Sequence, residues 1–285
     1  MNHLENYYAN YDEEGRLLSK HGQVEYRTTM KYIHEMLEKA DAQSKAAGDV
    51  FKTTATNCKQ RKILEVGAGT GRYSIALAKE GYEVDALEYT EHNLEIMNSK
   101  IAGDRLSNIR TYHGTALDLS RFADESFDIT LVLGPMYHLY TKEDKHKAME
   151  EAIRVTKTGG YIFVAYCMNE ATMLQYVFGK GNLWNCLNNN MLTEDFNCIS
   201  EEKDLFELVR TEAIDELNAN FTNIKRVKLV ASDGATNYMR DCIDAMDDAT
   251  FEMWMKYHFT ICERTDLIGA THHSLDILTK ETVEK

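Results

Sequence analysis

The sequence predicts an α/β fold in which a doubly wound, mostly parallel sheet of seven strands carries helices on both faces. Short apolar runs alternate with segments of helical periodicity from residue 61 onward, a pattern typical of such a sheet. A glycine-rich turn follows the first apolar run. Because 285 residues exceed one compact core but do not fill two full-sized domains, we expect a main domain with an insertion.

The first elements are predicted from periodicity and turn residues. Apolar residues recur at helical spacing over 22–40, which predicts a helix ahead of the core. A buried strand over 62–67, a helix over 72–79 and a second strand over 82–87 then form one βαβ unit. Gly81 is expected to end the helix of this unit.

The same alternation continues through the middle of the chain. Thr141 and Asp144 resemble a capping box, which predicts a helix start, and Gly159 and Gly160 predict the turn that follows this helix. The predicted elements are a helix over 91–100, strands over 109–113 and 127–133, a helix over 141–157 and a fifth strand over 161–167.

After residue 167 the pattern changes to helices rich in Met and aromatic residues, with strand candidates over 206–209 and 224–231. Residues 274–279 alternate like a strand that returns to the sheet. The sequence therefore predicts four regions. They are an N-terminal helical lid (1–60), the core (61–168), a mainly helical cap with further core strands, inserted after strand five (169–265), and a C-terminal strand (266–285).

The composition limits the classes of partner. A formal net charge of -14 disfavours polyanions such as nucleic acid and anionic membrane surfaces. No apolar run approaches the roughly 18 residues that a membrane span requires. The first residues show neither a basic start nor an apolar stretch, so we expect no secretory signal and a cytoplasmic protein.

The six cysteines are scattered, and none of them forms a Cys-x-x-Cys pair. Several have apolar neighbours, so buried thiols are expected rather than a disulfide framework or a zinc site. They are Cys58, Cys167, Cys186, Cys198, Cys242 and Cys262.

Three glycines lie between the first predicted strand and the helix after it, at positions 67, 69 and 71. Missing side chains let the backbone turn tightly and approach a ligand, which indicates a nucleotide-like molecule. The dinucleotide fingerprint requires a glycine where Arg72 stands, and the lysine of a phosphate-binding loop is missing. Glu88 ends the second strand 17 residues after Gly71, where a carboxylate can accept both ribose hydroxyls.

With Glu65 included, the run Glu65-Val-Gly-Ala-Gly-Thr-Gly71 resembles motif I of the class I S-adenosylmethionine (SAM)-dependent methyltransferases. The resemblance extends over residues 61–168, because several separate motifs fall in order. It implies a Rossmann-like fold, an enzyme that uses SAM as its methyl donor, and S-adenosylhomocysteine as the product.

The resemblance also implies where the donor lies. The glycine loop would border the amino-acid part of SAM, Glu88 would take the ribose, and the loop after strand three would hold the adenine. The expected cofactor-binding residues are Glu65, Gly67, Ala68, Gly69, Gly71, Glu88, Tyr89, Thr115, Ala116, Leu117, Leu133 and Gly134.

Two of these positions leave alternatives open. Thr115 stands where family members often have an Asp that accepts from the adenine amine. Either the Thr115 hydroxyl substitutes, or Asp118 does, or the contact is missing. Glu65 either fixes the methionine amine through the loop or orders the loop backbone.

The segment Leu133-Gly-Pro-Met-Tyr-His-Leu139 resembles the part of small-molecule methyltransferases that passes the methionine end of SAM and faces the substrate. Methyl transfer is an in-line displacement at a sulfonium, which requires alignment and exclusion of water, and a base is optional. Tyr137 and His138 are the candidate catalytic residues. His138 either accepts a proton from the acceptor or only hydrogen-bonds the loop.

The ends of the chain carry further candidates. Tyr7, Tyr8 and Tyr11 either fold over the donor or pack as ordinary aromatic residues, and Arg16 either meets the donor carboxylate or is solvated. His272 and His273 adjoin the last strand, where they could reach the substrate cavity. Their surroundings lack the carboxylate or cysteine pattern of a metal site, so no metal is predicted.

The predicted function is SAM-dependent methyl transfer to an oxygen or nitrogen of a small-molecule acceptor. Two alternatives keep the donor: a non-catalytic SAM-binding regulator, and an enzyme that methylates a macromolecule. For nucleic acid, the Asn/Asp-Pro-Pro-aromatic motif is missing where Gly134-Pro-Met-Tyr137 stands. Arg72 argues against a nicotinamide-dependent oxidoreductase. The sequence predicts no oligomeric state.

Overall fold

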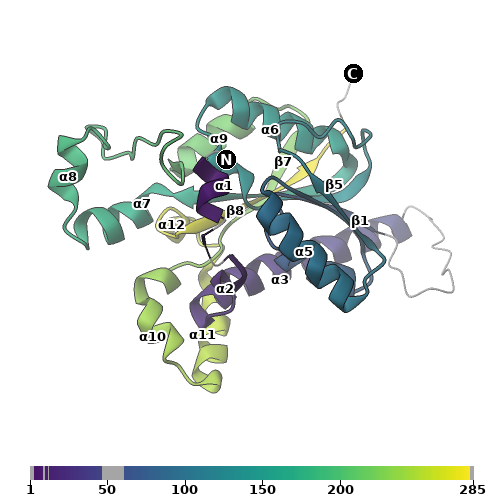
Figure 1. Ribbon diagram of the computed structural model, residues 1–285, viewed down its shortest axis with the longest axis horizontal. Helices are drawn as coiled ribbons and strands as arrows, with labels where there is room; N and C mark the ends of the chain where they lie inside the picture. The colour runs from purple at the N-terminus through teal and green to yellow at the C-terminus, as the bar shows by residue number, and fades with distance from the viewer. Residues whose placement is uncertain (1–2, 9, 12, 47–60, 283–285) are drawn as a thin grey trace.

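One sheet of eight strands forms the centre of the molecule in the computed structural model, which describes residues 3–8, 10–11, 13–46 and 61–282 (Figure 1). The strands are β1 (Lys62–Val66), β2 (Glu83–Glu88), β3 (Ile109–His113), β4 (Phe127–Val132), β5 (Thr156–Met168), β6 (Leu208–Val209), β7 (Ile224–Ala231) and β8 (His273–Lys280). Their spatial order is β3-β2-β1-β4-β5-β8-β7, and the two-residue β6 pairs with β5 beside this path. The predicted doubly wound sheet is confirmed.

Strand direction decides which residues share an edge of the sheet. Strands β1 to β6 pair in parallel, whereas β8 runs antiparallel to both β5 and β7. The first residue of β8, His273, therefore lies beside Cys167 at the end of β5, and Ser274 lies beside Ala231 at the end of β7. The start of β8 and the carboxyl ends of the parallel strands meet at one edge.

Alternate residues of the buried strands feed two apolar cores, one on each face of the sheet. In β5, Phe163 faces α3 (Lys20–Ala46) and its neighbour Val164 faces α6 (Lys142–Val155). Helices α4 (Arg72–Lys79) and α5 (Glu91–Asp104) share the face of α3, and α9 (Thr211–Asn218) shares that of α6. This arrangement is the layering expected for parallel strands.

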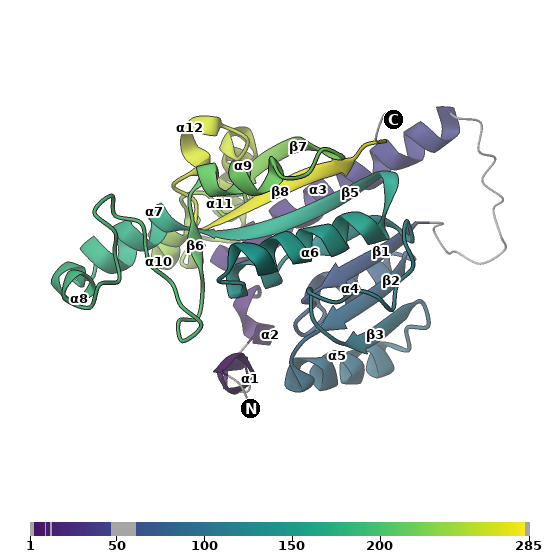
Figure 2. The same cartoon turned by 90° about the horizontal axis from the view of Figure 1, so that it is seen from above.

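The N-terminal region differs from the predicted lid over 1–60. The helix α3 is longer than the predicted 22–40, and its residues Tyr32, Ile33 and Met36 are fully buried in the core. Only the short helices α1 (His3–Tyr8) and α2 (Glu13–Arg16) stand in front of the sheet edge, as Figure 2 shows. The apolar stripe of α3 is wide enough to make it a core helix.

The predicted single cap consists of two helical groups on separate connections. The first follows β5 and contains α7 (Asn169–Thr172), a π-helix (Met173–Phe178) and α8 (Leu183–Asn188). The second lies between β7 and β8 and contains a 3₁₀-helix (Thr236–Met239), α10 (Arg240–Asp244), α11 (Asp248–Ile261) and α12 (Thr265–Ile268). In Figure 1 the first group projects to the left and α10 and α11 lie below. Helix α9 and strand β7, which separate them in sequence, belong to the core.

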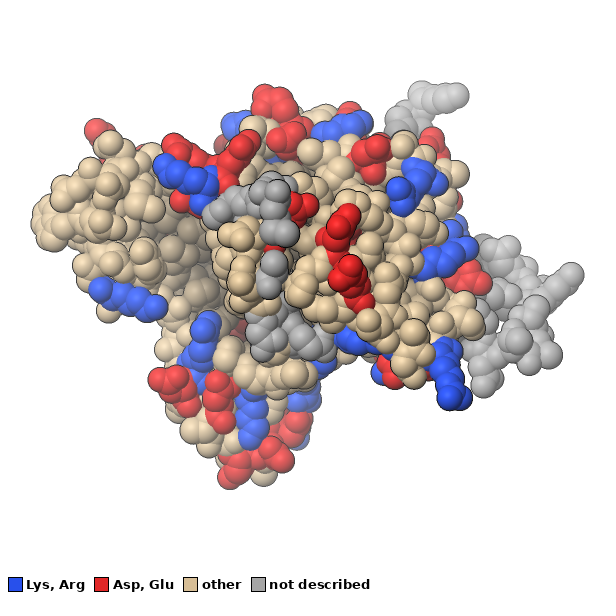
Figure 3. Space-filling model, viewed as in Figure 1, with Lys and Arg blue, Asp and Glu red and all other residues tan. Residues whose placement is uncertain are grey.

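Few charged side chains cover the first helical group in the view of Figure 3. Trp184 and Phe178 of this group are 71% and 53% exposed. Within the described residues, no helix combines the length and the apolar character needed to cross a lipid bilayer. The described cysteines are all free, and Cys167, Cys186 and Cys262 are buried as expected. Cys58 lies outside the described residues.

Candidate functional site

A cavity of about 440 Å³ opens at the edge where the parallel strands end. Such an edge is where doubly wound sheets bind ligands. Of the residues predicted to bind the cofactor, those that line this cavity are Glu65, Gly67, Ala68, Gly69, Glu88, Tyr89, Thr115, Ala116, Leu117, Leu133 and Gly134. Tyr137 and His138 line it as well.

Gly71 is the one predicted cofactor residue that does not line the cavity. It precedes α4 with a φ of +82°, and a Cβ at this position would lie 2.8 Å from Cγ of Met97. The residue is therefore required for a left-handed turn packed against α5. Its place in the motif reflects the fold of the loop and not a wall of the cavity.

The glycine loop brings backbone to the cavity surface. Gly67 has a φ of +73°, and a Cβ there would lie 2.7 Å from Cδ of Pro135, so only glycine fits. The backbone N–H groups of Gly67 and Ala68 both donate to the carbonyl oxygen of Leu87, at 2.8 and 3.0 Å. These bonds fix the loop against the end of β2.

Glu88 connects the glycine loop to the start of α5. Its Oε2 accepts from the backbone N–H of Gly69 at 2.7 Å, and its Oε1 accepts from the backbone N–H and hydroxyl of Thr90 at 2.9 and 2.8 Å. A carboxylate offers about four acceptor directions. Oε2 therefore keeps room for one further donor from the cavity that Glu88 lines.

Glu65 is buried beneath the loop. Its Oε2 accepts from the backbone N–H of Ser74 at 2.9 Å and from the Ser74 hydroxyl. Burial raises the pKa of Glu65 to about 8, against the opposing effect of these two bonds. Both contacts are to the first turn of α4, so the geometry favours the second alternative, in which Glu65 orders the loop backbone.

The loop after β3 separates the two residues proposed for the adenine contact. Thr115 lines the cavity, and its hydroxyl accepts from the backbone N–H of Leu117 at 3.3 Å. Asp118 instead accepts from the backbone N–H of Ser120 at 3.0 Å and is not among the lining residues. The structure therefore does not bring Asp118 to the cavity.

His138 ends a 3₁₀-helix, η1 (Pro135–His138), that follows β4. Its Nδ1 donates to the carbonyl oxygen of Leu205 at 3.0 Å, so in the neutral ring Nε2 accepts from the hydroxyl of Tyr8, at 2.9 Å. Burial lowers the pKa of His138 to about 4. The ring is therefore neutral near pH 7 and joins α1 to the segment before β6.

A second cavity of about 510 Å³ adjoins the first. Residues that line both cavities form the wall between them, and they are Tyr8, Arg16, Glu25, Tyr137 and His273. His272 lines only the second cavity, as do Tyr7 and Tyr11. The two histidines thus reach a cavity beside the predicted donor site.

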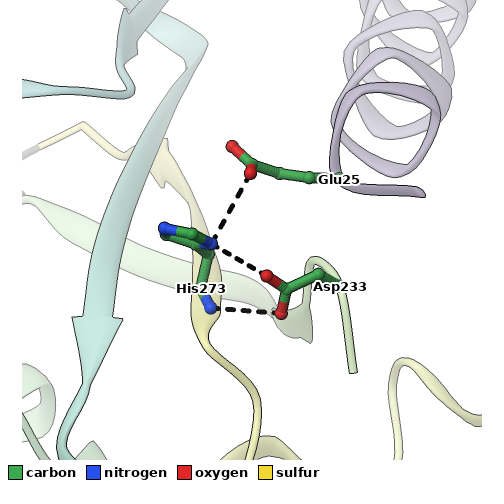
Figure 4. A group of neighbouring side chains, drawn as sticks. All are labelled: Glu25, Asp233 and His273. Atoms are coloured by element: carbon green, nitrogen blue, oxygen red, sulfur yellow. Dashed lines mark hydrogen bonds and ion pairs between the residues drawn. The ribbon is translucent and has the colours of Figure 1, made fainter. Parts of the chain in front are cut away.

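Arg16 does not stand alone at this wall, because its Nη1 donates to Oε2 of Glu25 at 2.9 Å. Glu25 and Asp233 both face His273, and the sequence analysis missed these two carboxylates (Figure 4). Asp233 stands two residues after the predicted strand over 224–231, a signal that could have found it. Glu25 lies inside a predicted helix, and only the packing of α3 brings its side chain to this wall.

Residues 63–160 match the family described as methyltransferase domain. A demethylmenaquinone methyltransferase of Clavibacter sepedonicus is 38% identical over 104 residues, which cover 36% of this chain and 40% of that protein. A glycine/sarcosine N-methyltransferase of Aphanothece halophytica is 28% identical over 142 residues, 47% of this chain and 53% of that protein.

A crystal structure of a SAM-dependent methyltransferase from Methanosarcina mazei has the same fold, with a TM-score of 0.52 at 15% sequence identity. The alignment covers 80% of this chain and 95% of that one. The chain spans about half the length of the two curated relatives.

Proposed function

We propose that this chain, which belongs to the class I SAM-dependent methyltransferases, transfers the methyl group of SAM to an oxygen or nitrogen of a small-molecule acceptor. The observation that carries the proposal is the first cavity, because every predicted cofactor residue except Gly71 lines it. The net charge of -14 disfavours nucleic acid as the acceptor. The two curated relatives are named for small acceptors, demethylmenaquinone and glycine or sarcosine.

In the proposed complex, each part of SAM meets one segment of the cavity wall. The adenine lies on the loop of Thr115, Ala116 and Leu117, and a ribose hydroxyl donates to Oε2 of Glu88. The methionine part lies along the glycine loop, where Gly67 and Gly69 leave the backbone uncovered. The methyl group then faces the wall that Tyr137 shares with the second cavity.

The reaction forms a bond between the acceptor atom and the methyl carbon while the bond from sulfur to that carbon breaks. The electron pair of the broken bond stays on sulfur, which neutralises the sulfonium and gives S-adenosylhomocysteine. The acceptor atom finally loses its proton. Alignment of the reacting atoms and exclusion of water are the main requirements of this displacement, and the cavity wall would supply the alignment.

We propose that His138 acts as a positioning residue that holds Tyr8 against the cavity. A ring whose pKa is about 4 is a poor proton acceptor at neutral pH. The His138→Gln variant should keep turnover within about tenfold of the native protein, whereas loss of a general base reduces rates by roughly 10² to 10⁴. A larger loss, measured as S-adenosylhomocysteine formed per minute, would restore the catalytic role.

Tyr137 is proposed to shape the wall between the cavities. Its hydroxyl donates to the carbonyl oxygen of Leu133 at 3.1 Å, which closes the turn after β4. Its own carbonyl oxygen accepts from the backbone N–H of Glu207 at 2.8 Å. These bonds fix the segment that faces the proposed methyl group.

Calorimetric titration with SAM, S-adenosylhomocysteine and NAD tests the donor. We expect the first two to bind and NAD to give no heat. Binding of NAD without SAM would contradict the proposal. Incubation with SAM and a panel of small oxygen and nitrogen acceptors then tests the activity. A protein that binds SAM and forms no S-adenosylhomocysteine with any acceptor would instead be the SAM-binding regulator.

A further inference from the structure

The start of β8 is placed beside the donor cavity by strand direction. Because β8 is antiparallel to β5 and β7, its first residue lies at the edge where those strands end. His273 stands opposite Cys167, and its side chain is 24% exposed at the wall between the two cavities. The second cavity lies on the other side of the wall that the methyl group of the proposed SAM complex faces.

The two ring nitrogens of His273 have different surroundings. Nδ1 donates to Oδ2 of Asp233 at 2.8 Å and lies 3.5 Å from Oε2 of Glu25. Nε2 points away from both carboxylates (Figure 4). Asp233 is fully buried, and its Oδ1 is fixed by the Thr271 hydroxyl at 2.6 Å and the backbone N–H of His272 at 3.0 Å. The ring is therefore held in one orientation.

The two carboxylates also set the charge of this ring. Burial alone would lower the pKa of His273, but Glu25, Cys167 and Asp233 together raise the pKa well above its ordinary value. His273 is thus an imidazolium whose Nδ1–H is taken by Asp233. Its Nε2–H has no partner among the described residues, and His273 lines both cavities, where a charged donor favours an anionic partner.

The second cavity is locally basic, although the chain as a whole is acidic. Arg16 and Arg240 line it together with His273, and Glu25 is the only carboxylate among the described residues of its lining. Arg240 donates to Oδ1 of Asn237 at 2.8 Å and makes no ion pair within the described part of the chain. Cations at the wall of a small cavity concentrate a small anion.

Aromatic rings supply much of the remaining wall of this cavity. They are Tyr7, Tyr8, Tyr11, Tyr137 and Phe206. Tyr7 and Tyr11 stack with ring centroids 5.1 Å apart, and Tyr137 and Phe206 meet edge to face at 5.3 Å. Such walls accept a flat or apolar body next to the charged group of a ligand.

Glu25, Asp233 and His273 could also be considered as ligands of a metal ion. One ligand atom from each of them lies within 4.8 Å of the others. The facing oxygens already accept hydrogen bonds from cationic or amide groups. Arg16 donates to Oε2 of Glu25, and the amide of Asn237 donates to Oδ2 of Asp233 at 2.6 Å. To bind a metal ion, Nδ1 of His273 would also have to give up the proton that it donates to Oδ2 of Asp233, whereas the Nε2–H donor suits an anion without such a change.

We infer that the second cavity is the acceptor site and that the acceptor is a small molecule with a flat or apolar body and one anionic group, a carboxylate or a phosphate, bound by His273 and Arg240. The identification as an acceptor site rests on the proposed function. The chemistry of the anion rests only on the cavity wall.

Calorimetry on the protein saturated with S-adenosylhomocysteine tests this inference with benzoate, phenyl phosphate and the neutral benzamide. We expect benzoate or phenyl phosphate to bind more tightly than benzamide by about tenfold, the value of one hydrogen bond to a charged group. The two anions show which anionic group the site takes. His273→Gln and Arg240→Met should each remove the preference, and Arg240→Met, which changes a residue of the second cavity alone, should leave the affinity for S-adenosylhomocysteine the same.

Two matched variants on the exposed surface serve as controls. His92→Gln and Arg264→Met make the same chemical changes away from both cavities and should keep the preference for the anion. Thermal unfolding of each variant confirms that it is folded.

Several results would overturn the inference. They are equal or absent binding of all three probes, an anion preference that His273→Gln leaves unchanged, and a His273→Gln variant that loses S-adenosylhomocysteine instead, which would assign His273 to the donor. Stoichiometric binding of Zn²⁺ that His273→Gln abolishes would assign a metal site. If the native protein binds no S-adenosylhomocysteine, the proposed function fails, and the anion titration on the unliganded protein still tests the wall.

Discussion

The two adjoining cavities are built in different ways. The first takes most of its wall from the loops that follow β1, β2, β3 and β4, all within residues 65–141. The second collects residues from the N-terminal helices, the ends of β5 and β6, and both sides of the connection between β7 and β8. The first cavity is therefore encoded by local motifs, whereas the second exists only when distant segments pack.

The two cavities also differ in how they present polar groups. The first offers backbone and one carboxylate whose bonds come mostly from its own loop, as in the contact of Glu88 with Gly69. The second depends on a chain of charges, in which Arg16, Glu25, His273 and Asp233 contact one another in turn. Replacing one residue should therefore disturb the second cavity at longer range than the first.

The largest expected effect is at Asp233. Asp233→Ala leaves the His273 imidazolium without its buried partner and should lower the free energy of unfolding by about 3 to 5 kcal/mol, as measured by urea denaturation. Asp85→Ala is the control, because Asp85 is similarly buried but its partners Arg110 and Lys62 line neither cavity, whereas Asp233 contacts the lining residue His273. Both variants should lose stability, and only Asp233→Ala should also lose binding of the anionic probe. Equal anion binding in the two would remove the distinction.

A glycine pair tests how closely the first cavity is packed. Gly67 and Gly159 have φ values of +73° and +78°, but a Cβ would meet Pro135 at Gly67 and open space at Gly159. Gly159→Ala should cost about 1 kcal/mol of stability from backbone strain alone. Gly67→Ala should cost about 2 to 4 kcal/mol because overpacking is added, and it should weaken binding of S-adenosylhomocysteine. Equal losses would show that the contact with Pro135 relaxes freely.

A substitution at Glu88 tests the proposed donor site alone, because Glu88 is not part of the chain of charges at the second cavity. Glu88→Ala should weaken binding of S-adenosylhomocysteine by about 1 to 3 kcal/mol, because it removes the proposed acceptor of a ribose hydroxyl. Glu91→Ala removes an exposed carboxylate three residues further along the chain, at the start of α5, and should leave the affinity unchanged. Calorimetric titration of both variants with S-adenosylhomocysteine measures the two affinities. An unchanged affinity in Glu88→Ala would mean that the ribose lies elsewhere.

The buried side chain of His138 makes the stability of the folded protein depend on pH. Its pKa falls from 6.5 to about 4 on folding, so between these values the unfolded chain binds more protons than the folded protein. Stability should therefore be lost as the pH falls from about 6.5 to about 4, by roughly 3 kcal/mol for this residue. Urea denaturation across this range should show a shallower decline in His138→Gln. An identical decline would assign the effect to other groups, such as His258, whose pKa burial lowers to about 4 as well.

The smallest expected effect concerns the adenine loop. Thr115→Val removes a hydroxyl from the first cavity and should weaken binding of S-adenosylhomocysteine by about 1 kcal/mol. Asp118→Ala changes a side chain outside the cavity and should leave the affinity unchanged. The opposite order in calorimetry would mean that the loop rearranges when the donor binds.

Particular residues show why the first cavity could be predicted from the sequence. The glycine loop, Glu88 and Thr115 each follow a strand that periodicity predicts, and parallel strands bring such positions to one edge whatever the rest of the chain does. Even for the first cavity, the sequence could not show which motif residues line the cavity and which pack against neighbouring helices. Gly71 packs against Met97, and the carboxylate of Glu65 accepts a hydrogen bond from Ser74. Both contacts depend on residues of the neighbouring helices.

The sequence by itself determined the alternation of strands and helices, the glycine loop and the donor class, because these follow from short-range periodicity and contiguous motifs. Tertiary structure alone decided that β8 runs antiparallel, that α3 is a core helix, and that the predicted cap divides into two groups. It also brought Glu25, Asp233 and His273 together from three distant segments. Strand direction and helix packing are set by the total burial of apolar surface over the whole chain, which no single segment contains.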